Sequence, residues 1–465
     1  MGRAGRTRND KLVALIDASG WSYDACAAAI RAVATEVGEN LASCNRSHIA
    51  KWIIGVQPSG RTPHIIAEAF SRRLGHIVSP PDLGFEVSHD TIAQIHGPDW
   101  WRRDPITDLV TVGKADLERR DFAVTALYSL AALAVPLQAW QEIAERGRRA
   151  RREGGAIGEG ELESVREMIG VLSRADERFG GGSGRSAAII YLTTDVAAYL
   201  RGSFTTDATR AQMFSAAAEL AYLVGWKAFD AGEHGLAQTY YLRALRLAND
   251  AGDGPLGGFI LRAMAHQAVD LGHGQASLQL AESSLEWSRV NGTPGATALF
   301  TVVKARGHAA QRQRRDAVTT MIEAERLLAH VDWDNEPIWI HRLGFGEPSL
   351  ANQTALSLRD LGDLNEAERQ FRRSVATRNG GAHRRIHALT LANLADIEFT
   401  RGEIAGACMH WNKALDDMSG LRSARATEAV RNARRRLATL GQRMPADARQ
   451  VDRRSADYLN DSRSQ

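Results

Sequence analysis

The sequence predicts an all-α protein, in which a bundle of four short helices precedes a solenoid of helical hairpins. Within the first 80 residues, apolar residues recur every three or four positions in four short segments. Between residues 210 and 420, one pattern of two helices joined by a tight turn occurs five times. A chain of 465 residues with 44% hydrophobic and 24% charged residues is long enough for more than one folded domain and is not typical of a disordered protein.

The N-terminal segment divides into four helices by its caps and breakers. Leu12, Leu15 and Ile16 share one face of a first helix, and Ser22 can cap a second that ends near residue 37. After a loop over 38–44, Asn45 can cap a third helix over 46–53. The pair Thr62-Pro63 begins a fourth helix in the favoured order of cap and then proline.

The third helix has two faces of different character. Ile49, Trp52 and Ile53 are spaced to face inward, which leaves Arg46, Ser47 and Lys51 on the outside. Four short helices with such a basic-polar outer face form the layout of a DNA reader, because a helix of this kind fits the major groove. Arg46 can form two parallel hydrogen bonds with O6 and N7 of guanine. Ser47 can contact several bases, and Lys51 can reach a base or a phosphate. We expect the remaining DNA contacts, to the backbone, from His48, Arg61, Arg72 and Arg73.

Two stretches of this segment resemble the phage-repressor-type helix-turn-helix found at the front of many actinobacterial regulators. They are residues 49–55 followed by Pro58, and residues 66–75. The resemblance implies that Arg46, Ser47 and Lys51 face the bases. This chain departs from the pattern in the loop over 38–44, which replaces the usual tight turn. The alternative is a helical bundle that binds protein.

Charge is distributed unevenly around a formal net charge of +3. Residues 1–80 carry ten Lys and Arg against six Asp and Glu, and residues 431–465 carry nine Arg against four Asp. Basic ends are typical of contact with a polyanion, and the alternative is a solvated surface. We assign residues 1–84 to the helix-turn-helix domain, 85–112 to a linker, 113–209 to a helical connecting region and 441–465 to a disordered basic tail.

The repeats are recognised by their turns, at positions 232, 272, 312, 362 and 402. Four of these positions are glycine and one is Arg312. Small residues such as Ala367 and Ala407 allow the helices of a pair to approach closely, and large ones such as Phe371 and Trp411 fill the space between pairs. The pattern resembles tetratricopeptide repeats, which implies an α-solenoid over residues 210–440.

The wider spacing between the third and fourth turns indicates an insertion within residues 330–346. Trp333, Trp339 and Asp334 in this segment can form an aromatic and acidic lip for a cationic or peptide ligand. The alternative is a packed loop between repeats.

No catalytic, metal or cofactor pattern is recognised, so we expect a protein that is not an enzyme and needs no cofactor. Cys26, Cys44 and Cys408 are far apart and odd in number, which predicts neither disulfide nor metal site. His383 and His387 have metal-capable spacing, but Arg384 and Arg385 between them favour a solvated basic face. The apolar run over 123–136 follows a twin arginine but is too short to span a membrane, so we interpret it as a buried helix and expect a cytoplasmic protein.

The whole order resembles actinobacterial regulators with tetratricopeptide-like C-terminal regions, and is similar in layout to Gram-positive peptide-pheromone receptors. The resemblance implies a sequence-specific transcriptional regulator that binds double-stranded DNA as a homodimer, does not contact a membrane, and senses a peptide, small ligand or protein through its solenoid. The alternative is an interaction adaptor of the tetratricopeptide type without specific DNA binding.

Overall fold

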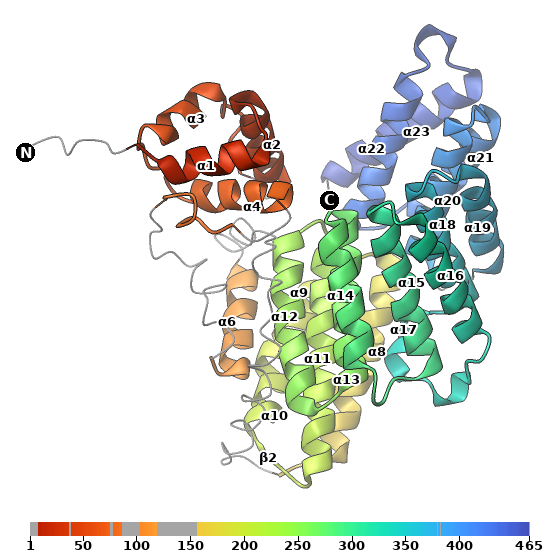
Figure 1. Cartoon of the computed structure of the whole chain (residues 1–465). Helices are drawn as coiled ribbons and strands as arrows, with labels where there is room; N and C mark the ends of the chain where they lie inside the picture. The colour runs from red at the N-terminus through yellow and green to blue at the C-terminus, as the bar shows by residue number, and fades with distance from the viewer. Residues whose placement is uncertain are drawn as a thin grey trace, which may run out of the picture. The chain divides into compact units, whose positions relative to one another are not determined.

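The computed structural model describes residues 8–36, 39–74, 78–85, 103–118, 156–378, 380–381 and 383–464. Helices make up almost all of its regular structure, which confirms the predicted all-α fold (Figure 1). The chain divides into two compact units, namely residues 1–146 with 233–239, and residues 147–232 with 240–465.

The described helices of the first unit lie on either side of the 86–102 segment. They are α1 (Asp10–Ser19), α2 (Tyr23–Glu36), α3 (Arg46–Ile53), α4 (Thr62–Leu74) and α6 (Pro105–Glu118). The prediction of a linker over 85–112 is wrong at its end, because α6 begins at Pro105. Asp104 accepts a hydrogen bond from the backbone N–H of Thr107 (2.7 Å), so Asp104-Pro105 is a helix start. The connecting region predicted from residue 113 lies outside the described residues over 119–155, and so does the apolar run over 123–136.

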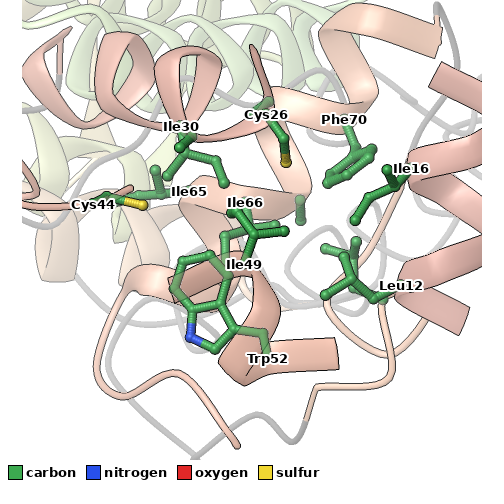
Figure 2. Packing of buried hydrophobic residues seen from close by; sticks show 14 of the residues in the cluster. Leu12, Ile16, Cys26, Ile30, Cys44, Ile49, Trp52, Ile65, Ile66 and Phe70 are labelled. Atoms are coloured by element: carbon green, nitrogen blue, oxygen red, sulfur yellow. The ribbon is translucent and has the colours of Figure 1, made fainter. Parts of the chain in front are cut away.

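Helices α1 to α4 enclose a single apolar core (Figure 2). Ile49 and Trp52 of α3 pack there with Ile66 and Phe70 of α4, as their helical spacing predicts. The segment after α4 is tied back to α1, since the Asn9 side chain donates to the carbonyl of Leu83 (2.7 Å). A Cβ atom on Gly84, whose φ is +71°, would lie 2.4 Å from Asn9 Oδ1, so this closure requires glycine.

The second unit begins with helices that precede the repeats. Two short strands, β1 (Ala156–Ile157) and β2 (Ser203–Phe204), pair in parallel with Ala156 opposite Ser203. The helices between and after them are α8 (Glu159–Phe179), α9 (Arg185–Tyr191), a π-helical stretch (Leu192–Val196), α10 (Ala197–Arg201) and α11 (Asp207–Asp230).

Helical hairpins then follow one another to the C-terminus (Figure 1). Their helices are α12 (His234–Ala251, in this unit from Tyr240), α13 (Gly254–Asp270), α14 (Gly274–Trp287), α15 (Pro294–Ala310), α16 (Arg314–Leu328), α17 (Ile338–Leu343), α18 (Glu347–Asp360), α19 (Leu364–Thr377), α20 (Arg384–Thr400), α21 (Ile404–Met418), α22 (Ala424–Ala438) and α23 (Ala446–Ser464). Short 3-10 turns lie at Trp333–Asn335 and Gly441–Arg443.

The five predicted turn positions all adopt left-handed backbone. The φ angles are +79° at Gly232, +84° at Gly272, +61° at Arg312, +83° at Gly362 and +83° at Gly402. Glycine adopts this conformation without a steric penalty, and Arg312 adopts it against its preference. The turn spacing therefore identified the hairpins correctly, including the position without glycine.

The hairpins stack because each shares its apolar faces with the next. Helix α14 packs on both α13 and α15, and α19 packs on both α18 and α20. Ala367 and Ala407 are fully buried beside the large side chains of Phe371 and Trp411. The predicted solenoid of helical hairpins is thus confirmed.

The expectation of a disordered tail over 441–465 is wrong, because Ala446–Ser464 forms helix α23. Ala448 and Val451 are fully buried in the same core as Leu437 of α22, and Tyr458 packs against it. These residues recur at helical spacing on one side of an arginine-rich segment. The charge of the segment concealed an amphipathic helix that adds a sixth hairpin to the stack.

Candidate functional site

A cavity of about 230 Å³ opens within the second unit, lined chiefly by the first helices of successive hairpins. Helices α11, α13, α15 and α18 each contribute the residue that lies six positions before the left-handed turn. These residues are Trp226, His266, Arg306 and Leu356. Stacking of these four hairpins brings this one position of each into a common row, and the row forms a wall of the cavity.

Amide side chains from α18 and α20 also line the cavity. Asn352 of α18 accepts a hydrogen bond from Thr390 Oγ1 (3.2 Å), and Asn393 of α20 accepts one from Arg359 (3.1 Å). The neighbouring Gln353 has a buried Oε1 atom without a hydrogen-bond partner in the described structure. An amide with an unused acceptor, such as Gln353, beside other amides suits a ligand with a peptide-like backbone.

The carboxylate of Asp270 in the cavity lies close to two arginines and a histidine. Asp270 lies 3.1 Å from Arg306 Nη2, 3.7 Å from Arg425 Nη2 and 3.6 Å from His266 Nε2. Burial lowers the pKa of His266 to about 3, opposed by Asp270 and assisted by three nearby arginines, so the imidazole is neutral at neutral pH. Its Nδ1 can then accept from Arg306 Nη1 (3.1 Å). Burial alone would raise the pKa of Asp270, but the surrounding cations hold it below its ordinary value.

Two other arginines of the cavity have no carboxylate at ion-pair distance among the described residues. Arg262 of α13, 4% exposed, donates to the Tyr222 hydroxyl (3.3 Å) and lies 4.6 Å above the ring of Phe259. Arg378, which follows α19 and is 8% exposed, contacts Ser349 Oγ at 3.4 Å. Burial lowers the pKa of Arg378 to about 10, only partly opposed by Glu177. The Nε atoms of both arginines are buried and have no partner in the described structure.

A buried ion-pair network holds α8 against the repeats. Asp176 of α8 lies 3.3 Å from Lys227 Nζ on α11 and 2.8 Å from Arg385 Nη2 on α20. Arg385, which is fully buried, also reaches Glu177 (3.1 Å) and Asp230 (3.3 Å). The prediction of a solvated basic face around His383 and His387 is therefore wrong at its centre. A charged residue was read as exposed because its partners lie more than 150 positions away.

In the N-terminal bundle, the structure places the outer-face residues of α3 as expected. Arg46, Ser47 and Lys51 are exposed, while Ile49, Trp52 and Ile53 are buried. Asn45 caps the helix by accepting from the backbone N–H of Ser47 (3.0 Å), and His48 completes the capping box, with Nδ1 lying 3.4 Å from the Asn45 backbone N–H. His48 is thus engaged at the start of the helix.

The three arginines expected to contact phosphates differ in their surroundings. Arg61 pairs with Glu39 at 2.9 Å. Arg72 pairs with Glu68 at 2.9 Å and Glu36 at 2.7 Å. Arg73 donates through Nε to the Ser19 carbonyl (2.9 Å) and remains exposed. Arg61 and Arg72 are therefore committed to pairs within the domain, which leaves Arg73 as the most accessible of the three.

The aromatic residues of the insertion are not brought together on one surface. Trp339 is buried, stacked on Phe259 with ring centroids 4.4 Å apart. Trp333 and Asp334 are exposed in the 3-10 turn. Glu336 points inward and accepts from the backbone N–H of Gly295 (2.7 Å). These positions favour a packed loop between repeats.

Sequence reasoning missed the residues that line the cavity. A signal was present, since the residues six positions before the first three turns are Trp226, His266 and Arg306, where a helix buried against apolar neighbours would carry small or aliphatic side chains. The turns predict the hairpins, but which residues of successive hairpins share a wall depends on how the hairpins stack.

Every helix in the described part of the chain is too short or too polar to span a lipid bilayer. No curated protein matches the sequence. The family model described as the SP15 N-terminal domain matches residues 12–86, the segment that forms the N-terminal bundle. A solved structure described as a Rap protein complexed with competence and sporulation factor is similar in fold, with 14% identity over 80% of this chain and 87% of that chain and a TM-score of 0.43. The chain thus joins an N-terminal segment similar to the SP15 N-terminal domain to a C-terminal region of stacked helical hairpins.

Proposed function

We propose that the repeat region binds a short peptide, or a short segment of a protein partner, in the cavity of the second unit. The observation that carries this proposal is the set of amides on α18 and α20, with an unpaired Gln353 oxygen beside them. Peptide backbones offer both donors and acceptors at regular spacing, and this is the chemistry that such amides complement. The role is one of binding and not of catalysis.

A peptide selection tests this directly. The full-length protein is immobilised and presented with a displayed library of random octapeptides, and the affinities of enriched peptides are measured by fluorescence polarisation. Gln353→Trp places a bulky ring in the cavity and should weaken these peptides at least tenfold. Gln279→Trp, on an exposed position of α14, should leave their affinity unchanged. The proposal fails if no peptide is enriched, or if Gln353→Trp binds the enriched peptides as well as the native protein.

A second function, sequence-specific binding of double-stranded DNA by the N-terminal bundle, is favoured by one observation. The outer face of α3 presents Arg46, Ser47 and Lys51 to solvent while its inner face is buried. A short DNA module binds weakly by itself, so we also propose a homodimer that matches two half-sites about one helical turn apart. A peptide that changes the curvature of the solenoid would then change the spacing of the two bundles.

Selection from random duplexes, followed by affinity measurements at several salt concentrations, tests the DNA proposal. Affinity should fall steeply with salt as phosphates are neutralised. Arg46→Ala should lose about 1–3 kcal/mol of discrimination at one base pair. Arg431→Ala, an exposed arginine of α22, provides the control. If Arg46→Ala lowered the affinity for all duplex sequences equally, Arg46 would not contact a base. If the native protein bound no duplex at low salt, the proposed DNA binding would be rejected. Light scattering of the purified protein checks the dimer.

A further inference from the structure

The cavity that we propose as a peptide site contains more positive charge than its own carboxylates balance. Five arginines line it, from α13, α15, α18, α22 and the end of α19. Two carboxylates, Glu177 and Asp270, face the same space. His266 adds no positive charge at neutral pH, because burial lowers its pKa to about 3.

The two carboxylates are already shared with other cations. Asp270 is paired with Arg306 and, at the edge of the ion-pair distance, with Arg425. Glu177 accepts from Arg385 at 3.1 Å. The fifth arginine, Arg359, is paired with Asp360 at 2.9 Å. Arg262 and Arg378 are therefore left without a carboxylate of their own in the described structure.

Arg262 and Arg378 are both more than nine-tenths buried as residues. Removing a charge from water is unfavourable unless an opposite charge and hydrogen bonds replace the lost solvation. Arg262 receives only a hydroxyl oxygen and aromatic rings, and Arg378 only a long contact to a hydroxyl at 3.4 Å. A ligand anion would provide the missing partner for each.

We propose that the peptide site selects acidic peptides, an inference that rests on the proposed function. Arg378 and Arg262 each bind a carboxylate of the ligand. Guanidinium groups bind carboxylates through two parallel hydrogen bonds, and both of these groups have an Nε–H without a partner. The amides of α18 and α20 then contact the peptide backbone. Selectivity for acidic side chains or a free C-terminus comes from the arginines.

The direct test uses N-acetylated triglutamate as the probe and N-acetylated, C-amidated triglutamine as its neutral counterpart. Binding to the full-length protein is measured by isothermal titration at low ionic strength. Triglutamate should bind at least tenfold more tightly than amidated triglutamine. Arg378→Gln should weaken triglutamate at least tenfold and leave the neutral peptide unchanged. Arg431→Gln on the exposed face of α22 should change neither.

A stability measurement separates a ligand-binding role of Arg378 from a structural one. Because the Arg378 side chain makes only one long hydrogen bond in the described structure, Arg378→Gln should unfold at the same temperature as the native protein or at a higher one. A clear drop in melting temperature would assign the residue to folding and overturn its role as a ligand partner. Arg262→Gln provides a second, independent variant for the titrations.

The outcomes distinguish this inference from the proposed function on which it rests. Enriched octapeptides that are neutral, and that bind Arg378→Gln as well as the native protein, would overturn the acidic selectivity while leaving the peptide site intact. Inorganic phosphate that binds through Arg378 and competes with triglutamate at equal concentration would overturn the choice of carboxylate. If neither triglutamate nor any library peptide binds, both proposals fall.

Discussion

The buried ion pairs of Asp176 lead to a quantitative prediction for Asp176→Asn. The substitution keeps the shape of the side chain but removes a carboxylate that contacts Lys227 at 3.3 Å and Arg385 at 2.8 Å. Arg385 retains Glu177 and Asp230, whereas Lys227, which is fully buried, retains a hydrogen bond only to the Ser183 carbonyl (3.0 Å) among the described residues. Breaking a buried pair by removing one partner costs about 3–5 kcal/mol. Since Arg385 keeps two carboxylates, we expect the free energy of unfolding to fall by about 3 kcal/mol.

The pH dependence of this effect has a definite sign. Burial alone would raise the pKa of Asp176, but Arg385 and Lys227 together lower it below its ordinary value of 3.8. A carboxylate with a lowered pKa in the folded state contributes stability above its unfolded pKa and loses it as the pH falls. The difference in the free energy of unfolding between the native protein and Asp176→Asn should therefore stay constant from about pH 7 to pH 5. It should become smaller below about pH 4.

Urea unfolding followed by circular dichroism measures both effects. Glu428→Gln, which removes an exposed partner of Arg431 and Arg435, should change stability by less than about 0.5 kcal/mol. Adding Lys227→Met to Asp176→Asn removes the unpaired cation and should restore part of the loss. Equal unfolding midpoints for the native protein and Asp176→Asn at pH 7, or a double variant less stable than the single one, would refute the reasoning.

Four further substitutions test packing and backbone conformation. Gly258→Ala places a Cβ atom 2.6 Å from the Ser284 carbonyl oxygen and should destabilise the second unit by about 1–3 kcal/mol. Gly160→Ala in α8, where the space around the new Cβ atom is open, should stabilise the unit by up to about 1 kcal/mol. Thermal unfolding compares the two variants. Arg312→Gly relieves a left-handed residue and should raise stability by up to about 1 kcal/mol, and a loss would show that the contact of Arg312 with the Asp360 carbonyl matters more. Trp52→Ala should lower the stability of the N-terminal bundle by about 3–5 kcal/mol, and an unchanged hydrogen-exchange pattern in that bundle would contradict this.

The sequence alone was sufficient for the local structure of both regions. Apolar spacing placed Ile49, Trp52 and Ile53 in the core of the bundle, and the five turns located the hairpins. These features depend on neighbours within one or two helical turns, so a short window of sequence contains what is needed. The charge count of the C-terminal segment was misleading because helix α23 buries one narrow apolar face beneath many arginines.

Only the tertiary structure decided which charged residues are buried and which of them line one cavity. Arg385 joins Asp176 across 209 positions of sequence, and Arg378 and Arg262 reach one cavity from separate hairpins. The reason is physical: the stacking of hairpins sets these distances, and a pattern within one repeat does not encode how far successive repeats turn relative to one another. Whether a polar side chain is solvated, paired or left for a ligand therefore follows from packing between segments distant in the chain.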